Sequence, residues 1–280
     1  MKFDNFLDET YLKSICLLTK EKCFQLDSKS YRFYNEPMII FLIPTAKEMG
    51  FDGPTYPHQL PEKSSEIIEE LSHLSKKNLE KLYKITPVAA QVEYERIQDI
   101  KKRLAPAYPA LDLFNGLMYR NIKNDLNASD RKYLFEHTYI TSSLYGIISP
   151  NQQIAPHRLD FNLKLKLNEK SLKVYWRNDF DSFANSQDTI ISLLSSEFEM
   201  VFSPELREKF VTITFMEEKN GQLKKHSTIS KKARGKLLAQ AAKKNSQSLD
   251  DLKKLIFDGF TYQESLSENP TNLTFLKKLD

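Results

Sequence analysis

The sequence is poor in glycine, with seven in 280 residues. Loops that hold nucleotide phosphates on backbone N–H groups need several glycines at fixed spacing, because glycine lets the backbone approach the phosphate closely. The seven glycines here assemble neither the Gly-rich phosphate loop nor the dinucleotide-binding fingerprint. We therefore expect no nucleotide site that is built on either motif.

Long apolar runs and metal-binding spacings are also missing. No run approaches the roughly 20 apolar residues that a membrane helix needs, and the N-terminal MKFDNFLDETYLK carries acids where a signal peptide is apolar. The two cysteines, Cys16 and Cys23, match no zinc or redox spacing, and the five histidines show no ligand spacing. We expect a cytoplasmic protein in a reducing compartment, with no membrane partner, no metal and no cofactor.

Positive charge is concentrated in one stretch of the chain. Residues 223–244 (LKKHSTISKKARGKLLAQAAKK) hold eight lysines and arginines and no acid, although the formal net charge of the whole chain is only +4. The rest of the chain therefore carries net negative charge. A concentrated basic segment of this kind attracts an anionic partner.

The basic stretch also predicts a helix over residues 230–244, with Ser230 as its N-cap. Apolar residues recur on one face at Leu237, Leu238, Ala241 and Ala242, and the opposite face carries Lys232, Lys236 and Lys243. Arg234 falls on the apolar face, so we expect it to point inward. Lys231, Lys232 and Arg234 crowd the first turn, where the helix dipole disfavours cations unless an anion such as phosphate joins the free N–H groups. The pattern indicates an anion site.

Helix and strand patterns are mixed throughout the chain. The apolar run 38–43 predicts a buried strand that ends in a loop carrying Lys47. Ser64 or Ser65 begins an expected helix to Tyr83, and Thr86-Pro87 begins a second to about Arg103, which together predict an αα-hairpin. Further strands are expected at 111–114, 139–142, 161–167, 189–194, 210–216, 223–229, 257–262 and 272–277, and further helices at 129–137, at 181–187 and after Ser248.

We expect one compact α/β or α+β domain with a mixed sheet, a helical-hairpin lobe at 62–103 and a basic cleft. Residues 1–37 form the one expected appendage, because Asn35-Glu36-Pro37 breaks the helical pattern before the first strand.

Five short strings occur in order along the chain: IIFLIPTAK at 39–47, LDLFNGL at 111–117, SLYG with PHRLD between 143 and 160, LLSSEF at 193–198, and KKARG at 231–235. They resemble segments of the YaaA family of bacterial peroxide-stress proteins. The likeness runs from about Met38 to the C-terminus, so residues 1–37 lie outside it and Met38 is an alternative start. The domain is therefore identified as YaaA-like over residues 38–280.

The resemblance implies a cytosolic protein of the hydrogen-peroxide response. Members bind DNA through a positively charged cleft and help to limit iron-driven damage. The resemblance also implies a helix-hairpin-helix-like element, which falls at 62–103 here. That range contains no glycine, whereas the element usually has a Gly-x-Gly turn whose backbone N–H groups meet phosphate.

Two classes of function remain open. The first is binding of double-stranded or distorted DNA without catalysis, carried by Lys47, Arg158, Lys231, Lys232, Arg234 and Lys236. The second is a lyase- or hydrolase-type enzyme acting on DNA or a nucleotide, with Lys47 or Lys231 as nucleophile and Asp112, Asp160 or Glu197 as acid or base.

We favour binding, because strand-end carboxylates more often pair with an arginine than catalyse. A single concave site that contains Lys47, Asp112, Arg158, Glu197 and Arg234 would favour the enzyme. The oligomeric state is left open.

Overall fold

A computed structural model describes residues 38–225, 227–267 and 269–279 of the chain. The chain divides between Pro37 and Met38, and everything below belongs to the part that begins at Met38. The expectation that residues 1–37 are an appendage, and the two cysteines within them, lie outside the described residues.

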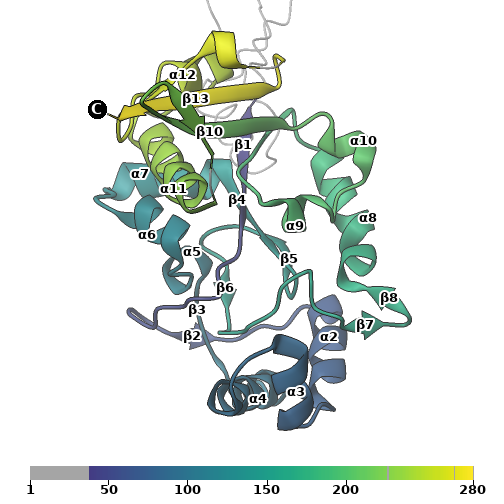
Figure 1. Ribbon diagram of the computed structural model, residues 1–280. Coiled ribbons are helices and arrows are strands. Elements are labelled where there is room, and N and C mark those ends of the chain that lie inside the picture. The colour runs from purple at the N-terminus through teal and green to yellow at the C-terminus, as the bar shows by residue number, and fades with distance from the viewer. Residues whose placement is uncertain (1–37, 226, 268, 280) are drawn as a thin grey trace, which may run out of the picture. The chain divides into compact units, whose positions relative to one another are not determined.

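An eight-stranded mixed sheet organises the domain, in the order β12-β13-β10-β9-β1-β4-β5, with β11 paired to β10 (Figure 1). Its strands are β1 (Ile39–Pro44), β4 (Thr138–Ser142), β5 (Gly146–Ile148), β9 (Thr189–Ser192), β10 (Val211–Lys219), β11 (Gln222–Lys224), β12 (Phe260–Tyr262) and β13 (Asn272–Leu279). The strand β1 runs parallel to β4 and β9, and β10 runs parallel to β9 and β13. The predicted mixed-sheet α/β domain is confirmed.

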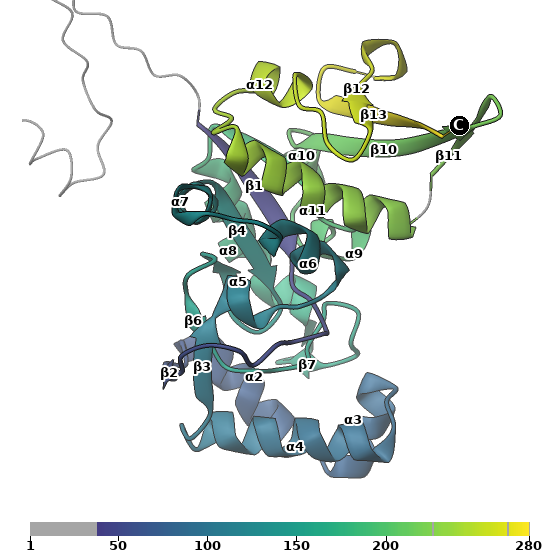
Figure 2. The ribbon, with the colours of Figure 1, turned by 90° about the vertical axis from the view of Figure 1, so that its left-hand side faces the viewer.

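Helices cover both faces of this sheet (Figures 1 and 2). One side carries α5 (Ala110–Leu113), α6 (Leu117–Lys123), α7 (Ala128–His137) and α11 (Ser227–Lys243), and the other carries α8 (Leu172–Asn185), α9 (Ser196–Glu199) and α10 (Pro204–Arg207). Apart from the helical lobe, the other elements are α12 (Leu249–Lys253), a 3-10 turn at Glu264–Leu266, and the short strands β2 (Tyr56–Pro57), β3 (Pro106–Pro109), β6 (Gln153–Ile154), β7 (Lys166–Leu167) and β8 (Lys170–Ser171).

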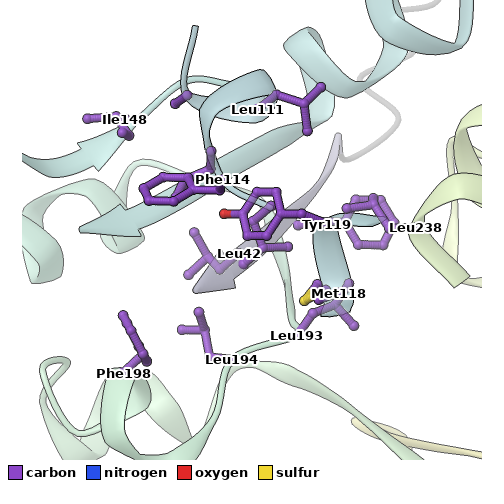
Figure 3. Packing of buried hydrophobic residues seen from close by; sticks show 14 of the residues in the cluster. Leu42, Leu111, Phe114, Met118, Tyr119, Ile148, Leu193, Leu194, Phe198 and Leu238 are labelled. Atoms are coloured by element: carbon purple, nitrogen blue, oxygen red, sulfur yellow. The ribbon is translucent and has the colours of Figure 1, made fainter. Parts of the chain in front are cut away.

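The predicted first strand lies at the centre of the core. Residues 39–43 of β1 are at most 2% exposed, as expected for a strand that is covered on both faces. Figure 3 shows Leu42 among Phe114 and Tyr119 from one flank and Leu193, Leu194 and Phe198 from the other. The core therefore joins the ends of β1 and β9 to the α5–α6 segment.

The helical lobe holds three helices rather than the two expected: α2 (Glu62–Ser72), α3 (Lys76–Tyr83) and α4 (Pro87–Lys101). The first predicted helix breaks at residues 73–75, because Ser75 caps a new helix by accepting a hydrogen bond from the Asn78 N–H. The predicted start at Thr86-Pro87 is confirmed, since Thr86 caps α4.

Several backbone N–H groups of the turn between α3 and α4 are bonded within the lobe itself. Lys84 takes the left-handed conformation and its N–H bonds to the Glu80 carbonyl, as does the N–H of Ile85. The Ala89 N–H is taken by the Thr86 side chain. Those N–H groups are therefore not available to a phosphate.

One predicted strand is wrong, and of another, 161–167, only Lys166–Leu167 (β7) is formed. Residues 110–113 form the short helix α5, because the N–H groups of Ala110 and Leu111 bond to the carbonyls of Gln152 and Pro150 in a distant loop. Residues 161–165 alternate in burial but form turns instead of a strand, since Asp160 accepts hydrogen bonds from the backbone N–H groups of Asn162 and Leu163.

Two predicted helix starts are also corrected. Asn127 caps α7, in a reciprocal capping box with Asp130, instead of Ser129 or Asp130. The basic helix α11 begins at Ser227 rather than after Ser230. The expected arm 223–229 of the β10–β11 hairpin is therefore only the strand Gln222–Lys224, and the expected cations of the first turn lie in the second turn or beyond.

No helix within the described ranges is long and apolar enough to cross a membrane.

Candidate functional site

A cavity of about 580 Å³ opens where β1 and β9 end. Both strands are parallel, so their carboxyl ends meet at one edge of the sheet, which is where ligand sites of open α/β sheets usually lie. Its walls come from five segments of the chain. The lining residues fall at 44–48, 116–120, 157–160, 195–198 and 228–234.

The loop after β1 is fixed by the α5–α6 segment. The buried Tyr119 donates its hydroxyl to the Pro44 carbonyl at 2.8 Å, and the Asn115 N–H donates to the Glu48 carbonyl at 2.8 Å. A Cβ at Gly116 would come within 2.8 Å of the Ala46 Cβ, so this close approach requires glycine. These contacts hold Lys47 at the cavity mouth.

Three charged side chains of the cavity wall form what we call the acidic cluster: Lys47, Asp160 and Glu197. Lys47 Nζ lies 3.0 Å from Asp160 Oδ2, and the Lys47 side chain is 60% exposed whereas that of Asp160 is 15% exposed. The pKa of the Glu197 carboxyl is raised, mainly by burial and then by the negative charge of Asp160, while the charge of Lys47 opposes the shift. The cluster can therefore hold and exchange a proton.

The basic cluster consists of Lys231 and Arg234 on α11. This helix packs closely on α6 (Figure 2), because Gly235 has no side chain at the contact. A Cβ there would overlap the Met118 backbone oxygen and come within 2.8 Å of the Asn121 Cβ. The glycine of the string KKARG is therefore required by this packing.

Arg234 is half-buried at the cavity wall, as its position among the apolar residues predicted. Burial lowers the pKa of its guanidinium, and the carboxylate of Glu199 opposes this. Glu199 accepts a hydrogen bond from Ser192 Oγ. Within the described part of the chain, no carboxylate oxygen lies within 4.0 Å of Arg234 or Lys231.

A third wall is the loop that carries Arg158. His157 is buried against Tyr145, with ring centroids 5.1 Å apart, and its Nδ1 donates to the Ala155 carbonyl at 2.9 Å. Burial lowers the pKa of His157 to about 4, so the ring is neutral near pH 7 and its Nε2 is an acceptor. The loop is also tied to α4, because the buried Glu93 carboxyl interacts with the Arg158 backbone N–H.

Of the five residues whose convergence on one concave site would favour the enzyme, the structure brings together four: Lys47, Arg158, Glu197 and Arg234. Lys231 and Asp160 join them. The placement expected for Asp112 is wrong, since it lies outside this cavity and forms a two-oxygen pair with Arg131, at 2.6 and 2.8 Å. The short helix α5, which replaced the predicted strand, turns it away.

Two of the predicted binding lysines also lie outside the cavity. Lys232 is exposed on α11. Lys236 Nζ lies 2.6 Å from Asp258 Oδ1, in a pair that Lys277 joins at 3.5 Å. Lys236 thus has a partner from the loop before β12, which helical periodicity alone does not reveal.

Sequence reasoning missed several polar side chains of the cavity, among them Tyr119, Arg120 and Thr228. Arg120 pairs with Glu48 of the opposite loop. The turn Asn115-Gly116, just before these residues, was the available signal, since a glycine at a helix start indicates close approach of another segment. Thr228 was missed because the helix was expected to begin after this residue.

Among the residues that the structure describes, no three His, Cys, Asp or Glu side chains gather in a way that could hold a metal ion.

Comparison with known proteins gives consistent matches over the described domain. The family model for the peroxide stress protein YaaA matches residues 38–266. UPF0246 proteins of Streptococcus uberis and of Streptococcus equi subsp. zooepidemicus are each 50% identical over 242 residues, which is 86% of this chain and 99% of the relative. A UPF0246 protein of Streptococcus agalactiae is 49% identical over the same length and coverage.

Proposed function

Because this chain belongs to the peroxide stress protein YaaA family, we propose that it binds DNA in the cytoplasm and protects it from iron-driven damage during peroxide stress. The family assignment supports the stress role. The DNA partner is supported by the charge arrangement around the cavity.

The proposal rests on a set of lysine and arginine side chains at the cavity that form no salt bridge within the described protein. Arg158, Lys231 and Arg234 line the cavity and Lys232 is exposed beside it. None of these four has a carboxylate oxygen within 4.0 Å in the described ranges. Cations that form no salt bridge within the protein suit a chain of phosphates, whose neutralisation by Lys and Arg releases condensed counterions.

Counterion release also links binding to protection. Ferrous ions held at DNA phosphates produce radicals beside the bases when they meet peroxide. Lysine and arginine side chains that neutralise those phosphates displace the cations condensed there. A protein bound in this way therefore moves iron away from the DNA that it covers.

A fluorescence anisotropy titration with labelled duplex DNA tests the proposal. Lys47 and Lys236 are already paired with Asp160 and Asp258, so four of the six predicted cations are available. Four phosphate contacts give a slope of about −3.6 for log K against log salt on duplex DNA. The variants Lys231→Gln and Lys232→Gln should each flatten the slope by about 0.9. Binding that does not respond to salt would contradict the proposal.

A second function is favoured by one observation, the raised pKa of Glu197 in a cavity at the ends of parallel strands. A carboxyl of this kind suits a general acid or base acting on DNA or a nucleotide. Lys47 is 60% exposed and paired with Asp160, and Lys231 is exposed. Neither has the desolvated setting that activates a lysine nucleophile.

The enzyme is tested by incubating the protein with duplex DNA, a bubble substrate and free nucleotides, and separating the products by chromatography. Product formation that stops with Glu197→Gln while DNA binding persists would establish it. Unchanged substrates under all these conditions leave binding as the function.

A further inference from the structure

Two polar atoms at the cavity are buried without a hydrogen-bond partner in the described structure: Glu197 Oε1 and Arg234 Nε. Such atoms are rare in folded proteins, because burying a polar atom without a partner costs free energy. Both residues line the same cavity. Their joint occurrence there points to a ligand that supplies the missing partners.

The two atoms need hydrogen-bond partners of different kinds. Arg234 is a donor only, and its electrostatic neighbour is Glu199. Glu197 is an acceptor, or a donor when it is protonated, and its neighbours are Asp160 and Lys47. The cavity thus has one place for an anion and another for a group that exchanges hydrogen bonds with a carboxyl.

The space between them suits a small molecule. A cavity of about 580 Å³ lies within the range of roughly 300–1,000 Å³ of small-ligand sites, and it is too small to admit a duplex. Part of the wall is apolar or neutral, from Leu117, Met118 and Phe198. A planar ring can lie against such side chains.

We propose that this cavity binds a single nucleotide unit, with its phosphate on Arg234 and Lys231 and its base edge or sugar hydroxyl on Glu197. The inference rests on the proposed function, because DNA supplies the unit when one nucleotide is extruded from the duplex. A free mononucleotide has the same chemistry and is the other source. Extrusion of a nucleotide costs least where it is already unpaired, so the cavity would direct the protein to distorted DNA.

The first arm of the test uses free ligands and the full chain. Isothermal titration calorimetry compares the four 2′-deoxynucleoside 5′-monophosphates with their nucleosides and with inorganic phosphate. At least one monophosphate should bind with 1:1 stoichiometry and about tenfold more tightly than its nucleoside or phosphate alone, because it alone satisfies both clusters. Monophosphates that bind no better than phosphate overturn the free-nucleotide source.

Variants assign that binding to the cavity. Lys231→Gln changes an exposed residue, so it should leave the fold intact and weaken monophosphate binding about tenfold without affecting the nucleoside. Glu197→Gln should weaken the monophosphate and the nucleoside alike. Lys243→Gln is the matched control, since Lys243 is exposed on the same helix and does not line this cavity. Equal effects from Lys231→Gln and Lys243→Gln would overturn the assignment.

The second arm places 2-aminopurine, whose fluorescence rises on unstacking, at an unpaired position in duplex DNA. Binding should raise the fluorescence with the parent protein but not with Glu197→Gln at matched occupancy. An unchanged signal in this arm, together with no preference for monophosphates in the first, rejects the nucleotide site.

The two proposals fail separately. If duplex DNA binds with the expected salt slope while both arms are negative, the nucleotide site is wrong and DNA binding stands. If a monophosphate binds in the cavity and DNA does not bind at any salt concentration, the cavity stands with a free nucleotide as its ligand. The DNA proposal then fails.

Discussion

The two charged clusters of the cavity differ in how far the protein itself neutralises their charges. In the acidic cluster Lys47 and Asp160 neutralise each other at 3.0 Å, and Glu197 has a raised pKa that favours its neutral form. In the basic cluster Lys231 and Arg234 have no carboxylate oxygen within 4.0 Å in the described part of the chain. The first is largely balanced by the protein itself, and the second is left for a ligand. The pairing of charges within the protein therefore decides which of them are available to a ligand.

The largest effect is expected from Gly235→Ala, which moves the basic cluster by separating α11 from α6. The new Cβ would overlap the Met118 backbone oxygen, which a flexible side chain cannot relieve. The free energy of unfolding should fall by about 2 kcal/mol, measured by chemical denaturation. Gly50→Ala is the matched control, since its Cβ would meet Asn115 at an ordinary 3.7 Å. Equal stability of the two variants would contradict the packing argument.

The next effect is that of Arg234→Met, which removes the charge and keeps most of the side-chain volume. The dissociation constant for duplex DNA should rise about tenfold, because one charged contact is lost. Stability should stay the same or increase slightly, since no buried carboxylate is left behind. Anisotropy and chemical denaturation measure the two quantities. A loss of about 3–5 kcal/mol in stability would show instead that Arg234 belongs to a buried ion pair.

Asp160→Asn should leave the acidic cluster, like the basic one, with a cation that has no carboxylate partner. It frees Lys47, whose pairing with Asp160 is then lost, and it retains an oxygen for the Asn162 N–H. DNA binding should strengthen several-fold at low salt, and the salt slope should steepen by about 0.9. The double variant Asp160→Asn with Lys47→Gln should return the slope to the parent value. If the salt slope is the same in the parent and in both variants, DNA does not reach this part of the cavity.

The smallest effect is a pH dependence of stability from Glu197. Its carboxyl pKa is raised in the folded protein, first by burial and then by Asp160. Above the unfolded value of about 4.3, the folded state therefore holds more protons than the unfolded state, and stability falls as pH rises through this window. Glu197→Gln lacks this loss. The melting temperature of this variant, relative to that of the parent protein, should therefore increase from pH 4 to pH 8. A constant difference across that range would contradict the assignment.

The sequence predicted well the parts of the fold that local pattern decides. The apolar run 38–43 correctly predicted a buried strand, and the strands expected at 38–43 and 189–194 placed Lys47 and Glu197 just beyond strand ends. The α5 helix was missed because hydrogen bonds from Ala110 and Leu111 to a loop about 40 residues away decide its conformation.

Partner choice within the site was harder to predict. Arg234 and Lys236 lie two residues apart, and periodicity correctly separated their faces. It could not reveal that Lys236 meets Asp258, or that Asp112 meets Arg131. Tertiary pairing of charges depends on which distant loop is brought near. The start of α11 was misjudged for a local reason, since Ser227 and Ser230 are both acceptable near a helix N-terminus.

The order of strands in the sheet has a consequence for how the protein is made. The central strand β1 pairs with β9, about 150 residues later, and β10 pairs with β13 near the C-terminus. Contacts between such distant segments slow folding, because the chain must close long loops before they form. The cavity walls likewise come from segments between residues 44 and 234. An unfinished polypeptide on the ribosome therefore cannot possess the binding site, and its basic helix is translated after every other wall. Affinity for DNA should appear only after α11 has left the ribosome.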